Sequence, residues 1–170
     1  VYSFTLFERR GGANVLRVQT DNVDQPFDIN EGARLNLGST AKLRTLLTYL
    51  EVVYRLHARY SALTPTELAE LDLGKNDVLR RWAVDYLATA TNREVAPMLE
   101  AAMDRRYSGN PSEAFATGGG VQSFTNFDRA ENSQILTVRD GFRHSVNLVF
   151  VRMMRDIVRY YQYPDEAGVE

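Results

Sequence analysis

The feature of this sequence that most constrains its fold is a long helical repeat of apolar residues that begins near residue 39. Apolar side chains recur at helical spacing as far as about Tyr60. The repeat is formed by Leu43, Leu46, Leu47, Leu50, Val53, Tyr54 and Leu56. It predicts one helix over about residues 39–60, buried over much of its surface.

The residues that precede this helix have the pattern of a β-hairpin. Residues 2–7 are rich in strand-forming types, residues 8–12 end in two glycines, and residues 13–20 alternate between two faces. We therefore predict a hairpin over residues 1–20 with its turn at residues 8–12. The polar segment from residue 21 to residue 37 is predicted to be a long approach loop.

Residues 64–106 have the capping signals and apolar spacing of a helical subdomain. Thr64, Pro65 and Glu67 together predict a capped helix start. A second helix is predicted to begin at Asn76 or Asp77, and a third at Thr91 or Asn92.

Further along the chain, the pattern changes twice. Residues 107–132 include a triple glycine and predict a loop-rich segment, whose length suggests a functional role or a partner surface. Residues 137–163 predict helices again, the first capped by Thr137. The predicted class is therefore α+β, a hairpin followed by a mostly α-helical remainder.

Composition excludes several kinds of protein. A net charge of −2 without a basic stripe argues against nucleic-acid binding. The chain has no cysteine, so we expect no disulfide framework and no thiolate metal site, and its two histidines are too few for most zinc sites. No apolar run is long enough for a membrane span. Because the chain opens with Val directly in a strand-like run, we expect it to be part of a longer protein, in which a signal or membrane anchor could lie upstream.

The chain has eighteen arginines but only two lysines, and one of these, Lys42, lies three residues after Ser39. Unlike arginine, a buried lysine can lose its proton and serve as a base. Positions i and i+3 on a helix are about 5–6 Å apart, which brings the amine within reach of the hydroxyl. Ser39 is therefore a candidate nucleophile and Lys42 its base. The alternative is a serine at a helix start followed by a solvated lysine.

A second polar group is formed by Ser145 and Asn147, which lie in the last helical region. A serine and an amide between two helices can face a cleft, but they also fit a capped helix junction. Ser108 and Asn110 have the same spacing, although the neighbouring Gly109 and Pro111 favour a turn there.

Together and in this order, the two motifs resemble the penicillin-binding transpeptidases, the serine acyl-transferases that cross-link bacterial peptidoglycan. The stretches that lead into both motifs, residues 34–42 and residues 126–152, are similar to those of the family. The resemblance implies a β-lactamase/transpeptidase-like fold and is closest to bifunctional members that carry an upstream glycosyltransferase domain. It is weakest over residues 60–107.

One departure from the family is serious. The family has a third motif, Lys-Thr-Gly or a relative, on a strand after the Ser-x-Asn helix, and no such motif follows Asn147 here. We expect the chain to be a partial domain that ends before this strand. The isolated 170 residues are therefore expected to have little or no transpeptidase activity.

The resemblance also implies a mechanism. Ser39 would attack the D-alanyl-D-alanine bond of a stem peptide, and β-lactams would acylate the same hydroxyl. Lys42, with a pKa lowered by burial and like-charged neighbours, would take the proton, and Ser145 would pass a proton to the leaving amine. Asn147 would bind the substrate backbone and help hold Lys42. The resemblance implies no metal and no organic cofactor. Such a protein would act on the outer face of the cytoplasmic membrane, which it would contact only through parts outside this chain.

Two other interpretations remain. A β-lactamase or penicillin-sensing domain would share the superfamily, although neither has a similar lead-in to Ser39. A non-catalytic α-rich scaffold, or a degenerate penicillin-binding module of a cell-wall protein, would use Ser39 and Lys42 only as helix-start residues. An unpaired sheet edge is also expected to favour association between chains.

Overall fold

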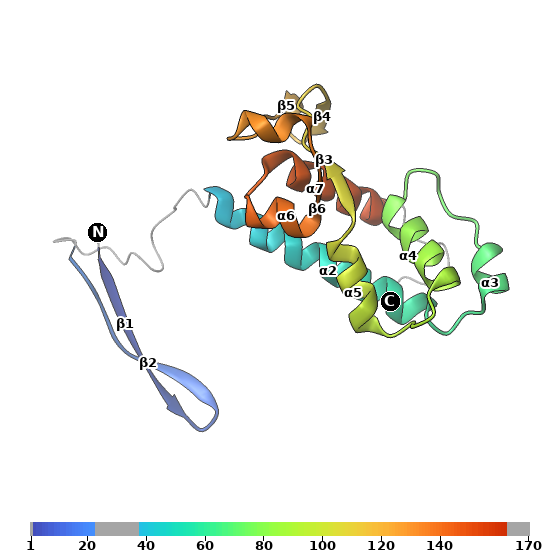
Figure 1. Ribbon diagram of the computed structural model, residues 1–170. Coiled ribbons are helices and arrows are strands. Elements are labelled where there is room, and N and C mark those ends of the chain that lie inside the picture. Colours follow the sequence, from blue (N-terminus) through green and yellow to red (C-terminus); the bar gives the residue numbers. More distant parts are fainter. Residues whose placement is uncertain (1, 23–37, 163–170) are drawn as a thin grey trace. The chain divides into compact units, whose positions relative to one another are not determined.

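The computed structural model describes residues 2–22 and 38–162, which form two units that we describe separately (Figure 1). The first unit extends to Gly38 and the second begins at Ser39. Strands make up the described part of the first unit, whereas helices dominate the second. This mixture agrees with the predicted α+β class.

The first unit contains the predicted hairpin. Strand β1 (Ser3–Arg10) pairs antiparallel with β2 (Ala13–Asp21). The turn is shorter than predicted and consists of Gly11 and Gly12, whose φ values of 59° and 85° fit a two-residue turn that requires positive φ at both positions. Residues 8–10 belong to β1 instead, because each pairs with a residue of β2. Most of the predicted approach loop, residues 23–37, lies outside the described residues.

The second unit is organised around α2 (Ala41–Tyr60), which a 3-10 turn, η1 (Gly38–Thr40), precedes. Helix α2 contacts α4 (Val78–Thr89), α5 (Val95–Met103) and α7 (Asn147–Gln162) (Figure 1). The predicted bounds of the long helix are confirmed, but its burial is one-sided. The buried side chains are Thr45, Leu46, Tyr49, Val52, Val53, Leu56 and Tyr60, whereas Leu43, Leu47 and Tyr54 are exposed.

Local capping explains the helix starts in the predicted helical subdomain. Thr64 and Glu67 form the complete capping box of α3 (Pro65–Ala69), and the Asp77 side chain accepts from the third residue of α4. The predicted start of α5 is wrong by a few residues, since Asn92 Oδ1 accepts from the backbone N–H of Glu94. That bond to the second residue along is a local turn that competes with helix.

The segment predicted to be loop-rich also contains short strands. Strand β3 (Arg106–Ser108) pairs with β6 (Ile135–Thr137), and β4 (Ala114–Thr117) pairs with β5 (Gly120–Ser123). A 3-10 turn, η2 (Arg129–Ser133), connects the two pairs. Strands of three or four residues are too short for an alternating pattern to be visible in the sequence.

The predicted helix pair at the end of the chain is confirmed as α6 (Val138–Arg143) and α7. Thr137 caps α6 by accepting from the backbone N–H of Asp140. The predicted end at residue 163 and the polar tail after it lie outside the described residues. Over residues 2–22 and 38–162, no helix combines the length and the apolar character that crossing a bilayer requires.

Candidate active site

Ser39 and Lys42 are brought together by the 3-10 turn η1, which holds Ser39, and the first turn of α2, which holds Lys42. Lys42 Nζ lies 3.0 Å from Ser39 Oγ, which is hydrogen-bond distance. Ser39 is exposed and Lys42 is half-buried. The pair is therefore open to a ligand on the serine side.

Ser145 reaches the same amine from a distant part of the chain. Its Oγ lies 3.1 Å from Lys42 Nζ, so the lysine has one hydroxyl on each side. The two serines are brought together only by the packing of α2 against the α6–α7 region. A neutral amine in this position could accept a proton from one hydroxyl and donate one to the other.

Ser145 occupies a strained backbone conformation. Its φ of 58° is in the left-handed region, which costs a residue with a Cβ atom about 1–3 kcal/mol. The turn is held by two backbone bonds, from the Ser145 N–H to the Phe142 carbonyl and from the Val146 N–H to the Gly141 carbonyl. Strain that the surroundings maintain is typical of functional sites, and here it aims the hydroxyl at Lys42.

Burial and one nearby carboxylate shift the pKa of Lys42 in opposite directions. Desolvation lowers the pKa of Lys42 below its ordinary value of 10.5, and the negative charge of Glu131 partly offsets this. The prediction that burial lowers the pKa of Lys42 is therefore confirmed. The prediction that like-charged neighbours also lower it is wrong, because the neighbouring charge is the negative charge of Glu131. In addition, the helix dipole places partial positive charge at the amino end of α2, and no acidic residue in the first turn neutralises it. This partial charge favours negative charge that develops on Ser39.

Asn147 lies close in sequence to Ser145, but its amide points elsewhere. Asn147 Nδ2 donates to the backbone carbonyl of Thr125 at 2.8 Å. Within the described ranges, no hydrogen bond joins it to Lys42, so the expected hold of Asn147 on the lysine is not found. The amide nitrogen instead connects the beginning of α7 to the segment after β5.

The structure therefore brings together three of the four residues predicted for the site: Ser39, Lys42 and Ser145. Sequence reasoning missed Glu131 and gave no individual role to Asn126, whose buried side chain bonds to the beginning of α7. In the sequence, Asn126 is the first residue of the stretch 126–152 that is similar to the family. In the part of the chain that the structure describes, no cluster of three or more His, Cys, Asp or Glu side chains could hold a metal ion.

No protein-family model matches the chain, and no curated protein or solved structure is significantly similar to it.

Proposed function

We propose that this chain is the nucleophile-bearing part of a serine acyl-transferase of the penicillin-binding transpeptidase class. The single observation that carries the proposal is the position of Lys42 Nζ, 3.0 Å from Ser39 Oγ and 3.1 Å from Ser145 Oγ. A lysine with a lowered pKa beside an exposed serine meets the basic requirement for an activated nucleophile. We also propose that the chain has a β-lactamase/transpeptidase-like fold and that its substrate is peptidoglycan.

The proposed reaction begins with Lys42 as a neutral amine. It takes the Ser39 proton while Ser39 Oγ forms a bond to the carbonyl carbon of the penultimate D-alanine. The Ser39 backbone N–H stabilises the resulting oxyanion at the amino end of α2. The protonated Lys42 then donates to Ser145, and Ser145 donates to the leaving nitrogen as the C–N bond breaks. Terminal D-alanine departs and an acyl ester remains on Ser39, ready for an acceptor amine.

β-Lactams are proposed to acylate Ser39 by the same steps, because their strained amide presents the same carbonyl to the hydroxyl.

The protein is proposed to work on the outer face of the cytoplasmic membrane, where its stem-peptide substrate lies. Association between chains through an unpaired sheet edge stays a prediction.

Labelling with a fluorescent penicillin tests the proposed function. The full natural protein that carries these 170 residues should be labelled covalently, and Ser39→Ala should abolish the label because the attacking oxygen is lost. Gel fluorescence, followed by mass spectrometry of the labelled peptide, identifies the site. Ser112→Ala, which changes an exposed serine in a loop, should be labelled like the natural protein.

Two results would count against this proposal. Absence of label on the natural protein would favour the non-catalytic or degenerate module. Rapid loss of the label by hydrolysis would favour a β-lactamase.

A further inference from the structure

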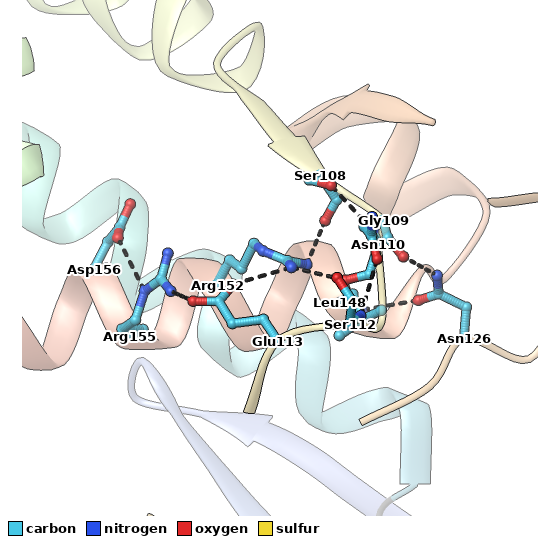
Figure 2. Close-up of polar contacts among 10 residues, drawn as sticks. All are labelled: Ser108, Gly109, Asn110, Ser112, Glu113, Asn126, Leu148, Arg152, Arg155 and Asp156. Atoms are coloured by element: carbon cyan, nitrogen blue, oxygen red, sulfur yellow. Dashed lines mark hydrogen bonds and ion pairs between the residues drawn. The ribbon is translucent and has the colours of Figure 1, made fainter. Parts of the chain in front are cut away.

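Asn126 is a buried polar side chain that joins the segment after β5 to the beginning of α7. It is 8% exposed, and each end of its amide has a partner. Its Oδ1 accepts from the backbone N–H of Leu148 at 3.0 Å, and its Nδ2 donates to the carbonyl of Gly109 at 2.8 Å (Figure 2). Nδ2 also donates to Asn132 Oδ1 at 3.0 Å.

The bond to Leu148 satisfies a group that the helix cannot satisfy itself. Leu148 is the second residue of α7, so its N–H has no carbonyl partner within the helix. Because Leu148 is fully buried, water is a poor substitute for that partner. Asn126 therefore acts as a helix cap supplied from another part of the chain. The neighbouring Thr125 adds a second connection through its carbonyl to Asn147.

The segment around Gly109, to which Asn126 Nδ2 donates, is itself held by α7. Arg152, buried on α7, donates to the carbonyls of Ser108 and Asn110 at 2.6 and 2.7 Å (Figure 2). The same guanidinium forms an ion pair with Glu113 at 3.1 Å. Gly109, between these two carbonyls, lies against the Glu131 backbone so closely that a Cβ atom would come within 2.1 Å of the Glu131 carbonyl oxygen. Asn126 therefore connects α7 to a segment that α7 itself anchors.

From these contacts we infer that Asn126 is a positioning residue that holds Ser145 against Lys42. Ser145 lies two residues before α7, in a strained turn that has no preference of its own for the observed φ. Asn126 holds the first turn of α7, so it determines where that strained turn lies. The inference rests on the proposed function only for its effect on catalysis, because the geometric effect on Lys42 does not depend on acylation.

The first experiment follows Lys42 directly. The chain has only two lysines, so ¹³Cε-lysine labelling gives two NMR signals, and Lys75→Arg assigns them. In Asn126→Ala, we expect Ser145 to move away and open the amine to water, which raises the Lys42 pKa toward its ordinary value. We also expect faster hydrogen exchange at the Leu148 amide. Thr64→Ala, which removes a helix cap from α3, should leave the Lys42 titration unchanged.

A second variant separates the two halves of the amide. Asn126→Asp retains an oxygen that can accept from Leu148 but loses the donor to Gly109, so its hydrogen exchange at the Leu148 amide should lie between that of the natural protein and that of Asn126→Ala. Thermal unfolding confirms that each variant is folded before the titration is interpreted. A folded Asn126→Ala protein whose Lys42 titration and Leu148 exchange match those of the natural protein would overturn the inference.

The second experiment measures the rate of Ser39 acylation by a fluorescent penicillin against pH in the full natural protein. A misplacement of about 1 Å can cost about 100-fold in rate, so Asn126→Ala should acylate about 10- to 100-fold more slowly. The pH at which its rate rises should also move upward. If the natural protein is not acylated but Lys42 responds to Asn126→Ala, the proposed function fails and the positioning inference stands. If acylation is unaffected in a folded Asn126→Ala protein, the inference fails and the proposed function stands.

Discussion

At the scale of single residues, the proposed function depends on the protonation of Lys42. Burial lowers the pKa of Lys42, so the folded protein releases this proton at a lower pH than the unfolded chain does. The unfolded chain therefore binds more protons between the two pKa values, and this group's contribution to stability rises with pH up to about 10.5. The same direction of shift places more of the lysine in the neutral form that a base requires.

The negative charge of Glu131 raises the pKa of Lys42 and so opposes the effect of burial. Removal of this charge therefore has a predictable effect. Glu131→Gln removes the negative charge that raises the pKa of Lys42, so that pKa should fall further below its ordinary value. The rise of Ser39 acylation with pH should then occur at lower pH than in the natural protein. Labelling rates with a fluorescent penicillin across a pH series measure this.

The control for this prediction is Glu51→Gln, which removes an exposed carboxylate farther along α2 and should leave the pH profile unchanged. An unmoved or upward-shifted profile in Glu131→Gln would contradict the role of Glu131.

At the scale of elements, the α6–α7 junction determines the direction of Ser145. Gly141 is buried on α6, directly against Val149 of α7. A Cβ atom at position 141 would lie 2.6 Å from Val149 Cγ1, which is too close for two carbon atoms. The glycine is therefore required here for close helix contact, and the turn that holds Ser145 depends on that contact.

Gly141→Ala should destabilise the protein, because the added methyl group forces α6 and α7 apart. Overpacking of this kind costs about 1–3 kcal/mol in the free energy of unfolding, which urea denaturation measures. Gly74→Ala is the matched control, since a Cβ atom there meets nothing within 4 Å and the residue does not require positive φ.

The double variant Gly141→Ala with Val149→Ala tests the cause. It should be less destabilised than the sum of the two single variants, because the smaller side chain leaves room for the new methyl group. If the losses in free energy of unfolding of the two single variants simply add, the contact between positions 141 and 149 does not cause the destabilisation by Gly141→Ala.

At the scale of the second unit, a buried polar network joins helices that are far apart in sequence. The Tyr107 hydroxyl on β3 donates to Asp156 Oδ2 of α7 at 2.9 Å and accepts from Arg105 at 3.0 Å. Arg105 also donates to the hydroxyl of Tyr49 on α2, at 3.3 Å, and its guanidinium lies over the ring of Trp82 on α4. Burial raises the pKa of Tyr107, so its hydroxyl keeps its proton and remains a donor.

Removal of the Tyr107 hydroxyl should weaken the whole unit. Tyr107→Phe leaves Asp156 without its phenolic donor in a buried position, which should lower the free energy of unfolding by about 1–3 kcal/mol. Equilibrium unfolding in urea measures the change. Tyr54→Phe, at an exposed position on α2, should have no measurable effect, and an equal loss in both variants would show that the network does not stabilise the fold.

Many of the local elements could be predicted from the sequence, because they depend on neighbouring residues. The two glycines of the hairpin turn, the capping box at Thr64 and the cap at Thr137 all act within a few positions along the chain. The bounds of α2 follow from its apolar spacing in the same way. The approach of Ser39 to Lys42 was also predictable, because positions three apart share one face of a helix.

Other features of the site were decided only by the tertiary structure. Ser145 reaches Lys42 across 103 positions of sequence, Asn126 reaches Leu148 across 22, and Asn147 binds Thr125 instead of the lysine. The strands β3 and β6 also form only because distant segments meet. Contacts of this kind depend on how complete elements pack against one another, and a local sequence pattern carries little information about that packing. The sequence by itself thus determined that Ser39 and Lys42 meet, whereas the packing of the second unit decided which groups surround them.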